Sequence, residues 1–228
     1  MIPGMGQKDF SPNTFLLGVC STRIFLYLSL QNYTALIPLL QQEWQMSNAA
    51  AGSIVSAYQT GFLVSMVSRA ALSGWGSAKK VFLYCSVAFA VSSLLAPSYL
   101  SAFLLRGLMG LCLGGTYTPV LKLISETFSS ASRGRAMGLF IGAGSLGHAG
   151  SLAATGWIAA RYGWQTTFLL TSLGPILGAV IPLVILRGMT ERKPEPRGRL
   201  LKKEVLTNRP ALLMITGYSA HTWELEAQ

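Results

Sequence analysis

The sequence predicts an all-α integral membrane protein with six transmembrane helices. Three observations support this class: six long apolar stretches, a composition that is 51% hydrophobic and only 11% charged, and cations gathered between the stretches. A helix needs about 20 mostly apolar residues to cross the roughly 30 Å of hydrocarbon in a bilayer. Strands of a membrane barrel would alternate apolar and polar residues, and these stretches do not.

The six predicted spans follow one another with short gaps. They cover residues 14–40, 50–68, 81–97, 101–121, 136–160 and 166–186. Each is expected to be helical, because lipid offers the backbone no hydrogen-bond partner. The predicted outer connections (41–49, 98–100 and 161–165) are short, whereas the inner connections (69–80 and 122–135) are basic.

The distribution of Lys and Arg predicts a cytoplasmic N-terminus, formed by residues 1–13. In this orientation fifteen cations lie inside, only Arg161 lies outside, and Arg23 and Arg106 fall within spans. Such a bias follows the positive-inside rule. We therefore expect a multi-pass protein of the plasma (inner) membrane. The net charge of +10 then reflects topology rather than binding of nucleic acid.

Two further segments follow the six-helix bundle of residues 14–186. Residues 187–209 include the run ERKPEPRGRLLKK, whose prolines and charges indicate a cytoplasmic central linker. Residues 210–228 open with an apolar run that is too short to cross a bilayer. We interpret this segment as the start of a truncated seventh helix. The alternative is a six-span protein with a short C-terminal tail.

The fourth span carries the most distinctive pattern of the chain. Arg106, Gly110 and Gly114 recur every four residues and therefore share one helix face, which Tyr117 continues. A connection that is first acidic and then basic, a glycine-rich fifth span and an aromatic entry to the sixth span at Trp164 follow.

This succession resembles the major facilitator superfamily of transporters. The resemblance implies twelve helices in two six-helix halves, with a substrate site between the halves at mid-membrane. The chain would then be the N-terminal half, built from two three-helix repeats, plus the start of the seventh helix.

The resemblance also implies gating segments at the inner membrane face, which here comprise Gly76, Lys79, Lys80, Glu126, Arg133 and Arg135. Ser73 and Gly74 depart from the family pattern, which has Asp and Arg there. For Glu126 and the two arginines, the alternative is a solvated surface cluster that contributes little. His148 follows Gly147 where the family's antiporters carry proline, which weakens an antiporter interpretation.

Charged residues inside the spans point to a transport pathway. The six spans contain no Asp or Glu but do contain Arg23 and Arg106. A charge in hydrocarbon costs at least about 3 kcal/mol, so each arginine should face a cavity or a partner. Arg23 lies near the bilayer midplane, and Tyr27 and Gln31 continue its face. We expect a cavity wall in which Arg23 contacts substrate. The alternatives are an arginine bonded to carbonyls of a neighbouring helix, or a span that begins later.

Arg106 lies near the outer end of its span, from where its side chain can reach the headgroups. The resemblance makes it a cavity residue linked to coupling, and the alternative is a structural anchor. His148 shares a face with Gly144 and Ser151 and is either a neutral histidine bonded between helices or a substrate contact. The candidate pathway residues are Arg23, Tyr27, Gln31, Gln59, Arg106, Tyr117 and His148. The expected helix-packing residues are Gly110, Gly114, Gly144 and Gly147.

Two cations and no carboxylate predict a secondary active or facilitative transporter of a small solute, specifically an organic anion, by alternating access. We expect no enzyme activity, no catalytic residues and no cofactor. We also expect no metal site, since the three cysteines lie in different spans without ligand spacing. The expected partners are membrane lipid, a small anionic solute, protons as a candidate coupling ion, and a missing C-terminal half or a second copy.

Three alternatives remain at this stage. One is a nitrate-like transporter of inorganic anions, and another is a non-functional truncated fragment. The third is an intramembrane serine enzyme built on Ser145 and His148, which lie three residues apart on one predicted helix, whereas such a dyad needs two helices.

Overall fold

The computed structural model describes residues 11–71, 77–93 and 98–186, together with Arg209, Leu212, Leu213 and Thr216. The chain divides into two compact units, Met1–Pro194 and Glu195–Gln228. The fold and site below belong to the first unit. Gly76 lies outside the described residues, as do the predicted linker and the predicted seventh helix except for the four residues named.

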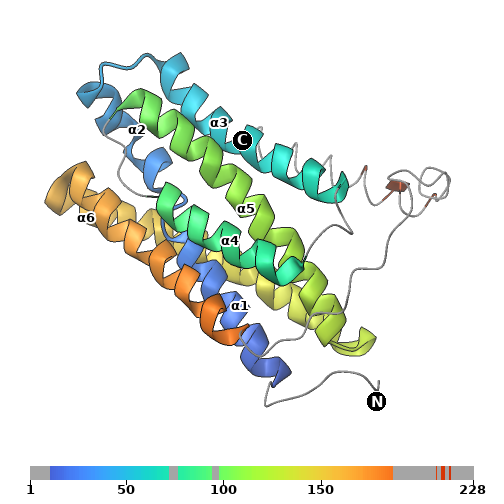
Figure 1. Cartoon of the computed structure of the whole chain (residues 1–228). Helices are drawn as coiled ribbons and strands as arrows, with labels where there is room; N and C mark the ends of the chain where they lie inside the picture. The colour runs from blue at the N-terminus through green and yellow to red at the C-terminus, as the bar shows by residue number, and fades with distance from the viewer. Residues whose placement is uncertain are drawn as a thin grey trace. The chain divides into compact units, whose positions relative to one another are not determined.

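Every element among the described residues is a helix, which confirms the predicted all-α class (Figure 1). The helices are α1 (Pro12–Tyr27), α2 (Asn32–Glu43), α3 (Asn48–Ala71), α4 (Ala78–Ser92), α5 (Tyr99–Thr127) and α6 (Ser130–Ile185).

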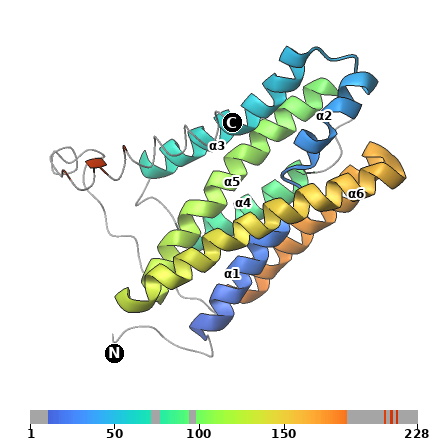
Figure 2. The same cartoon turned by 180° about the vertical axis from the view of Figure 1, so that it is seen from behind.

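Three stretches of the described residues are long and apolar enough to cross a membrane. They are Pro12–Glu43, Tyr99–Thr127 and Ser130–Ile185. The third contains the predicted fifth and sixth spans, because Gly163 breaks its helical geometry with φ 78° and ψ 174°. The two limbs of α6, residues 130–162 and 164–185, meet at this break and run back beside each other (Figures 1 and 2).

The predicted first span is not one continuous helix. It breaks between Tyr27, where α1 ends, and Asn32, where α2 begins. Non-helical backbone at membrane depth is tolerated where protein buries it. Ser29 and Leu30 within the break are 0% and 5% exposed, so the broken segment is covered by the rest of the bundle.

Helix α1 lies between the two limbs of α6, and glycines permit the close contact on both sides. A methyl group added at Gly147 of the first limb would lie 3.0 Å from the carbonyl oxygen of Ile24. One added at Gly178 of the second limb would lie 3.1 Å from the carbonyl oxygen of Thr22. Small residues of this kind let membrane helices approach closely, which strengthens their van der Waals packing.

Glycines also permit close packing of α3 against α5, which lie side by side in both views (Figures 1 and 2). A methyl group at Gly61 would lie 2.2 Å from the carbonyl oxygen of Gly107, and one at Gly110 would lie 2.0 Å from that of Tyr58. Helix α4 packs on the other flank of α5, where Gly115 faces the sulfur of Cys85.

The outer surface of the unit is apolar. Leu17, Leu146 and Val184 are 69%, 67% and 63% exposed. A water-soluble monomer rarely exposes so much contiguous apolar surface, whereas in a bilayer these side chains contact lipid. Trp157 and Tyr162 are also exposed, close to the break at Gly163. Aromatic side chains of this kind are enriched at the membrane–water interface.

The inner connection predicted at 122–135 is shorter than expected. Helix α5 continues to Thr127 and α6 begins at Ser130, so Glu126, Arg133 and Arg135 lie on helical turns rather than in a loop. A helix of 29 residues is about 44 Å long and extends beyond the hydrocarbon, where charged side chains meet water.

Candidate functional site

Two polar stripes of the sequence face each other inside the bundle. Arg23, Tyr27 and Gln31 lie on the first span, and Gly144 and His148 lie on the first limb of α6. The side-chain amide of Gln31 donates a hydrogen bond to Nδ1 of His148 at 3.1 Å. The rings of Tyr27 and His148 meet edge to face at 4.7 Å between centroids. An Nδ1 that accepts a hydrogen bond places the proton of a neutral ring on Nε2.

The backbone at the break in the first span joins the same arrangement. The backbone N–H of Gln31 donates to Oγ of Ser151 at 3.0 Å. Ser151 lies three residues beyond His148 on α6 and is fully buried. The Ser151 hydroxyl therefore accepts a hydrogen bond from a backbone N–H at the end of the break, just before α2 begins.

The guanidinium of Arg23 lies among three aromatic rings. Its Cζ is 4.8 Å from the ring centroid of Tyr27, 4.8 Å from that of Tyr117 and 4.4 Å from that of Phe140. Tyr117 and Phe140 are stacked at 6.0 Å. Cation–π contacts favour a charged guanidinium in a place of low dielectric. We name Arg23 with these three rings the Arg23 box.

The predicted spans contain no Asp or Glu, so none of them supplies a carboxylate to the Arg23 box. Within the described part of the chain, Nε of Arg23 is buried and has no hydrogen-bond partner. The residue as a whole is half-buried. Buried charges are normally paired, so a partly accessible guanidinium with an unpartnered Nε among the described residues is suited to receive an anion.

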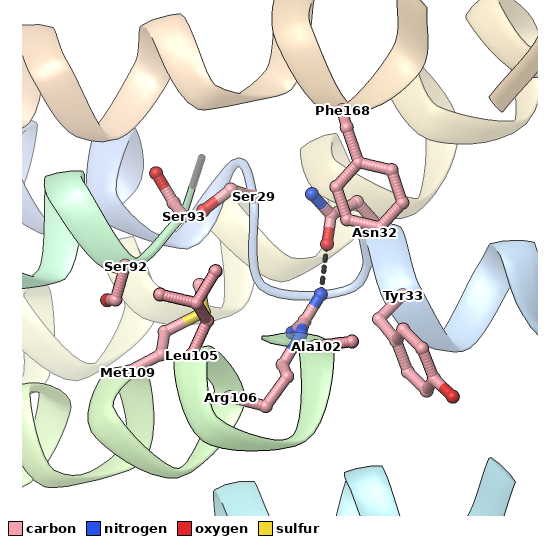
Figure 3. Close-up of a pocket in the computed structure, with 10 residues that line it drawn as sticks. All are labelled: Ser29, Asn32, Tyr33, Ser92, Ser93, Ala102, Leu105, Arg106, Met109 and Phe168. Carbon is pink, nitrogen blue, oxygen red and sulfur yellow. Dashed lines mark hydrogen bonds between the residues drawn. The ribbon is translucent and has the colours of Figure 1, made fainter. Parts of the chain in front are cut away.

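Arg106 occupies a different polar site, at the break in the first span (Figure 3). Its Nη1 donates to the carbonyl oxygen of Leu30 at 2.9 Å, and its Nη2 donates to Oδ1 of Asn32. The amide of Asn32 in turn donates to Oγ1 of Thr171 at 3.1 Å. The guanidinium also lies 5.3 Å from the ring centroid of Tyr33. This network ties α5, the break and the second limb of α6 together.

The position of Arg106 near the end of its span would let its side chain extend along the helix, but the guanidinium turns inward instead. The side chain is 8% exposed and points to the break in the first span. The physical reason is that the break releases a carbonyl group from its helical partner, and a guanidinium satisfies such a group well. The position of Arg106 in its own helix could not reveal this contact, because the acceptor belongs to another helix.

A small cavity adjoins Arg106. Its volume is about 10 Å³, which is about the space of one water molecule. Its lining includes Ser29, Ser93 and Phe168 (Figure 3). This space is too small for an organic solute, so in this conformation the surroundings of Arg106 are packed rather than open.

Gln59 does not join either site. It is exposed on α3. Gly52 and Ser56, which precede it at helical spacing, line an open groove of about 860 Å³ between α3 and α5. The walls of this groove are largely apolar and include Leu104 and Leu108. The structure therefore separates Gln59 from the Arg23 box, although both belong to polar stripes in the sequence.

Apart from Gly76, the predicted gating residues belong to the start of α4, the end of α5 and the start of α6, which lie at the end of the bundle opposite the turn within α6 (Figure 1). Glu126 forms an ion pair with Lys122, one turn earlier, at 3.7 Å. Arg133 and Arg135 lie in the first turns of α6. Lys79 and Lys80 lie in the first turn of α4, where the hydroxyl of Ser77 accepts from the backbone N–H of Lys80. An exposed i,i+4 pair contributes about 0.3–0.5 kcal/mol.

The predicted glycines fall into two groups. Gly110, Gly114 and Gly147 lie against neighbouring helices at distances that leave no room for a methyl group. Gly144 lies against the guanidinium of Arg23 instead. Among the described residues, no cluster of His, Cys, Asp and Glu is arranged to hold a metal. Ser145 is exposed, whereas its neighbour Gly144 is buried.

Sequence reasoning missed Asn32, Thr171 and Phe140. Asn32 follows Gln31, and a Gln–Asn pair in the middle of an apolar span is a signal that could have suggested it. Phe140 is an ordinary apolar residue of a membrane helix, and nothing in the sequence distinguishes it. Thr171 bonds to a residue 139 positions away, so only the fold reveals its role.

The fold and site define a helical membrane protein whose interior holds one buried and one half-buried arginine. The family model for the Major Facilitator Superfamily matches residues 19–223. The chain belongs to the major facilitator superfamily. This membership places it among transporters rather than enzymes.

Three relatives carry transporter names. A Bacillus subtilis protein named as a niacin/nicotinamide transporter is 28% identical over 191 residues, covering 74% of this chain and 43% of the relative. The gallate transporter of Pseudomonas putida is 25% identical over 150 residues, covering 64% and 33%. A Cupriavidus necator protein named as a sulfoacetate transporter is 27% identical over 173 residues, covering 72% and 38%. The chain thus spans less than half the length of each relative.

Solved structures share the fold. A peptide transporter POT in complex with sulfate matches with a TM-score of 0.69 at 16% identity, covering 93% of this chain and 45% of that one. A bacterial homologue of the human lysosomal transporter Spinster, in an inward-facing and unoccupied conformation, matches with a TM-score of 0.65 at 15% identity, covering 85% and 47%.

Proposed function

We propose that this chain forms one wall of a pathway along which a small organic anion crosses the membrane, with Arg23 as its cationic contact. The observation that carries the proposal is the Arg23 box: a half-buried guanidinium at mid-span, held by three rings, with a buried Nε that has no hydrogen-bond partner among the described residues. An anion would supply the missing charge and hydrogen bonds.

The names of the relatives support an organic anion over an inorganic one. Niacin, gallate and sulfoacetate are small carboxylates in their ionised forms, and each names a relative at 25–28% identity. Tyr27, Gln31 and His148 offer further polar groups within the same interior face. Tyr117 completes the pathway wall on α5. Arg106 belongs to the proposal as an interior cation that holds the neighbouring break in shape.

The proposed mechanism is alternating access, in which this six-helix unit rocks against a second unit around the Arg23 box. The second unit is either a complementary C-terminal half or a second copy of this chain. The N-terminus and the cluster of basic helix ends then lie on the cytoplasmic side of the plasma membrane. His148 is the candidate for proton coupling, since the spans contain no carboxylate.

Uptake measurements on protein expressed from its own gene test this proposal. We expect accumulation of labelled nicotinate or gallate in vesicles, and an increase of about tenfold or more in KM for Arg23→Gln, because a hydrogen bond to a charged group contributes about 1.5–3 kcal/mol. Arg23→Lys should restore part of the affinity. Arg161→Gln is the matched control, since Arg161 stacks on the exposed Trp157 instead of facing the interior.

Three results would contradict the proposal. Equal KM values for Arg23→Gln and the wild-type protein would remove Arg23 from the site. Uptake of nitrate with no uptake of any carboxylate would favour the inorganic-anion alternative. Absence of every uptake, with the protein folded and inserted, would favour a non-functional fragment.

A further inference from the structure

Gly144 differs from the other closely packed glycines of the bundle in what it touches. A methyl group at Gly144 would lie 2.4 Å from Nε of Arg23, 2.9 Å from Nη2 and 3.1 Å from Cζ. At Gly110 the nearest atom would be a backbone carbonyl oxygen, that of Tyr58. At Gly147, one turn along the same helix, the neighbours are Cβ of Tyr27 and the backbone of Ile24. Gly144 therefore makes room for a charged side chain, whereas the other two make room for a helix.

The guanidinium of Arg23 is confined from both directions. Gly144 lies against its Nε edge, and the rings of Tyr27, Tyr117 and Phe140 lie within 4.8 Å of its Cζ. Contacts shorter than about 3 Å between a methyl group and a nitrogen are repulsive, so an alanine at position 144 and the guanidinium in its present place exclude each other. The backbone at position 144 is thus one wall of the Arg23 box.

We propose that Gly144 is the positioning residue of the anion site: its lack of a side chain lets the guanidinium of Arg23 lie within the three rings and face the pathway. This inference rests on the proposed function for the role of Arg23. It goes beyond helix packing, because the residue acts through Arg23 and not through the approach of α1 to α6.

The two kinds of glycine predict different consequences of the same substitution. At Gly144 the obstructing atoms are the far end of a long, flexible side chain, so Arg23 moves and the helices stay in place. At Gly147 the obstructing atoms include backbone, so α1 and α6 must separate. At Gly142, on the same limb of α6, no described atom lies within 4 Å of an added methyl group. Gly142→Ala is therefore the matched neutral control.

The first experiment measures uptake of labelled nicotinate and gallate by protein expressed from its own gene. Gly144→Ala is expected to raise KM about tenfold with amounts of folded protein close to wild type, and Gly142→Ala to leave KM unchanged. In the Arg23→Gln background, Gly144→Ala should change KM less than twofold, because the side chain through which it acts is gone. Full additivity of the two substitutions would overturn the proposal.

The second experiment does not depend on transport. The apparent melting temperature of the detergent-solubilised chain is measured for Gly144→Ala, Arg23→Ala and the double variant. Gly144→Ala should lower this temperature in the wild-type background and lower it less, or not at all, when Arg23→Ala has vacated the space. Equal shifts in both backgrounds would overturn the placement of Arg23 by Gly144. Absence of uptake by the wild-type protein would instead overturn the proposed function. The melting data would still test whether Gly144 makes room for the side chain of Arg23.

Discussion

Nη1 of Arg106 donates a hydrogen bond to the carbonyl oxygen of Leu30, 2.9 Å away, at the point where the first membrane span ceases to be helical. The arginine comes from α5, and the carbonyl lies between α1 and α2. A backbone carbonyl without a partner is costly in a membrane interior, and so is an unpaired cation. Each group compensates for the other, so the break and the buried arginine depend on one another.

Substituting Arg106 should therefore destabilise the protein strongly. Arg106→Leu leaves the carbonyl of Leu30 and the amide oxygen of Asn32 without a donor, at a cost of about 2–5 kcal/mol. Arg106→Lys retains the charge but can serve the two acceptors less well, so it should lie between. Thermal unfolding in detergent measures both, with Arg161→Leu as the control on an exposed arginine. An unchanged melting temperature for Arg106→Leu would show that the break does not need this donor.

Substituting Asn32 should destabilise the protein more than substituting Thr171, although the two residues share a hydrogen bond. Asn32→Ala removes both the acceptor for Arg106 and the donor to Thr171, whereas Thr171→Val removes only one partner of Asn32. Since one neutral hydrogen bond contributes about 1 kcal/mol and one to a charged group about 1.5–3 kcal/mol, we expect at least a twofold difference in destabilisation. The same thermal measurement ranks the two variants. The opposite order would contradict the network as described.

Gly163 should tolerate no side chain. Its φ of 78° and ψ of 174° lie in a region open essentially only to glycine. Gly163→Ala should lower the stability by about 1–3 kcal/mol. Gly156→Ala provides the control on the same limb, because an added methyl group there meets no described atom within 4 Å. Similar melting temperatures for the two variants would contradict a strained turn at Gly163.

Gly110→Ala should weaken the packing of α3 against α5. The added methyl group would lie 2.0 Å from the carbonyl oxygen of Tyr58, so the two backbones must move apart. Such overpacking typically costs about 1–3 kcal/mol. Gly138→Ala, where the described residues leave open space, serves as the reference. We expect less folded protein in membranes for Gly110→Ala only, measured by size-exclusion chromatography of fluorescent fusions.

Chemical labelling should distinguish the two arginine positions. In a background with Cys20, Cys85 and Cys112 replaced by alanine, a water-soluble thiol reagent should label Arg23→Cys faster than Arg106→Cys. Arg23 is half-buried beside the proposed pathway, whereas Arg106 is 8% exposed within a packed network. Equal labelling rates, or faster labelling at position 106, would contradict this difference in access.

Helical periodicity was enough to place several site residues on common faces. The spacing of Arg23 and Tyr27 predicts one face of α1, that of Gly144, His148 and Ser151 predicts one face of α6, and these residues meet in the structure. Gln31, predicted to continue the first face, lies in the break after α1 and contacts Ser151 and His148 from there. That the two faces meet could not be predicted, because periodicity within a helix contains no information about its neighbour. The all-helical class followed from the length and composition of the apolar stretches, and the family from the pattern around Arg106.

The break in the first span could not be predicted because it depends on contacts between distant segments. Residues 28–31 contain neither glycine nor proline, so no local signal predicts the break in the first span. Arg106 stabilises that break from α5. The inner connection differs for another reason. The charges at Glu126 and Arg133 suggested a long loop, whereas α5 and α6 continue past the apolar core into water, where these charges are solvated.

Several hydrogen bonds of the first span reach late parts of the chain. Gln31 bonds to residues 117 and 120 positions away, and Asn32 to one 139 positions away. During synthesis, α1 and α2 therefore enter the membrane long before their polar partners exist. Arg23, Gln31 and Asn32 must wait in lipid or in the insertion machinery until α6 emerges. The polar contacts of the first span are therefore complete only after the second limb of α6 has been synthesised.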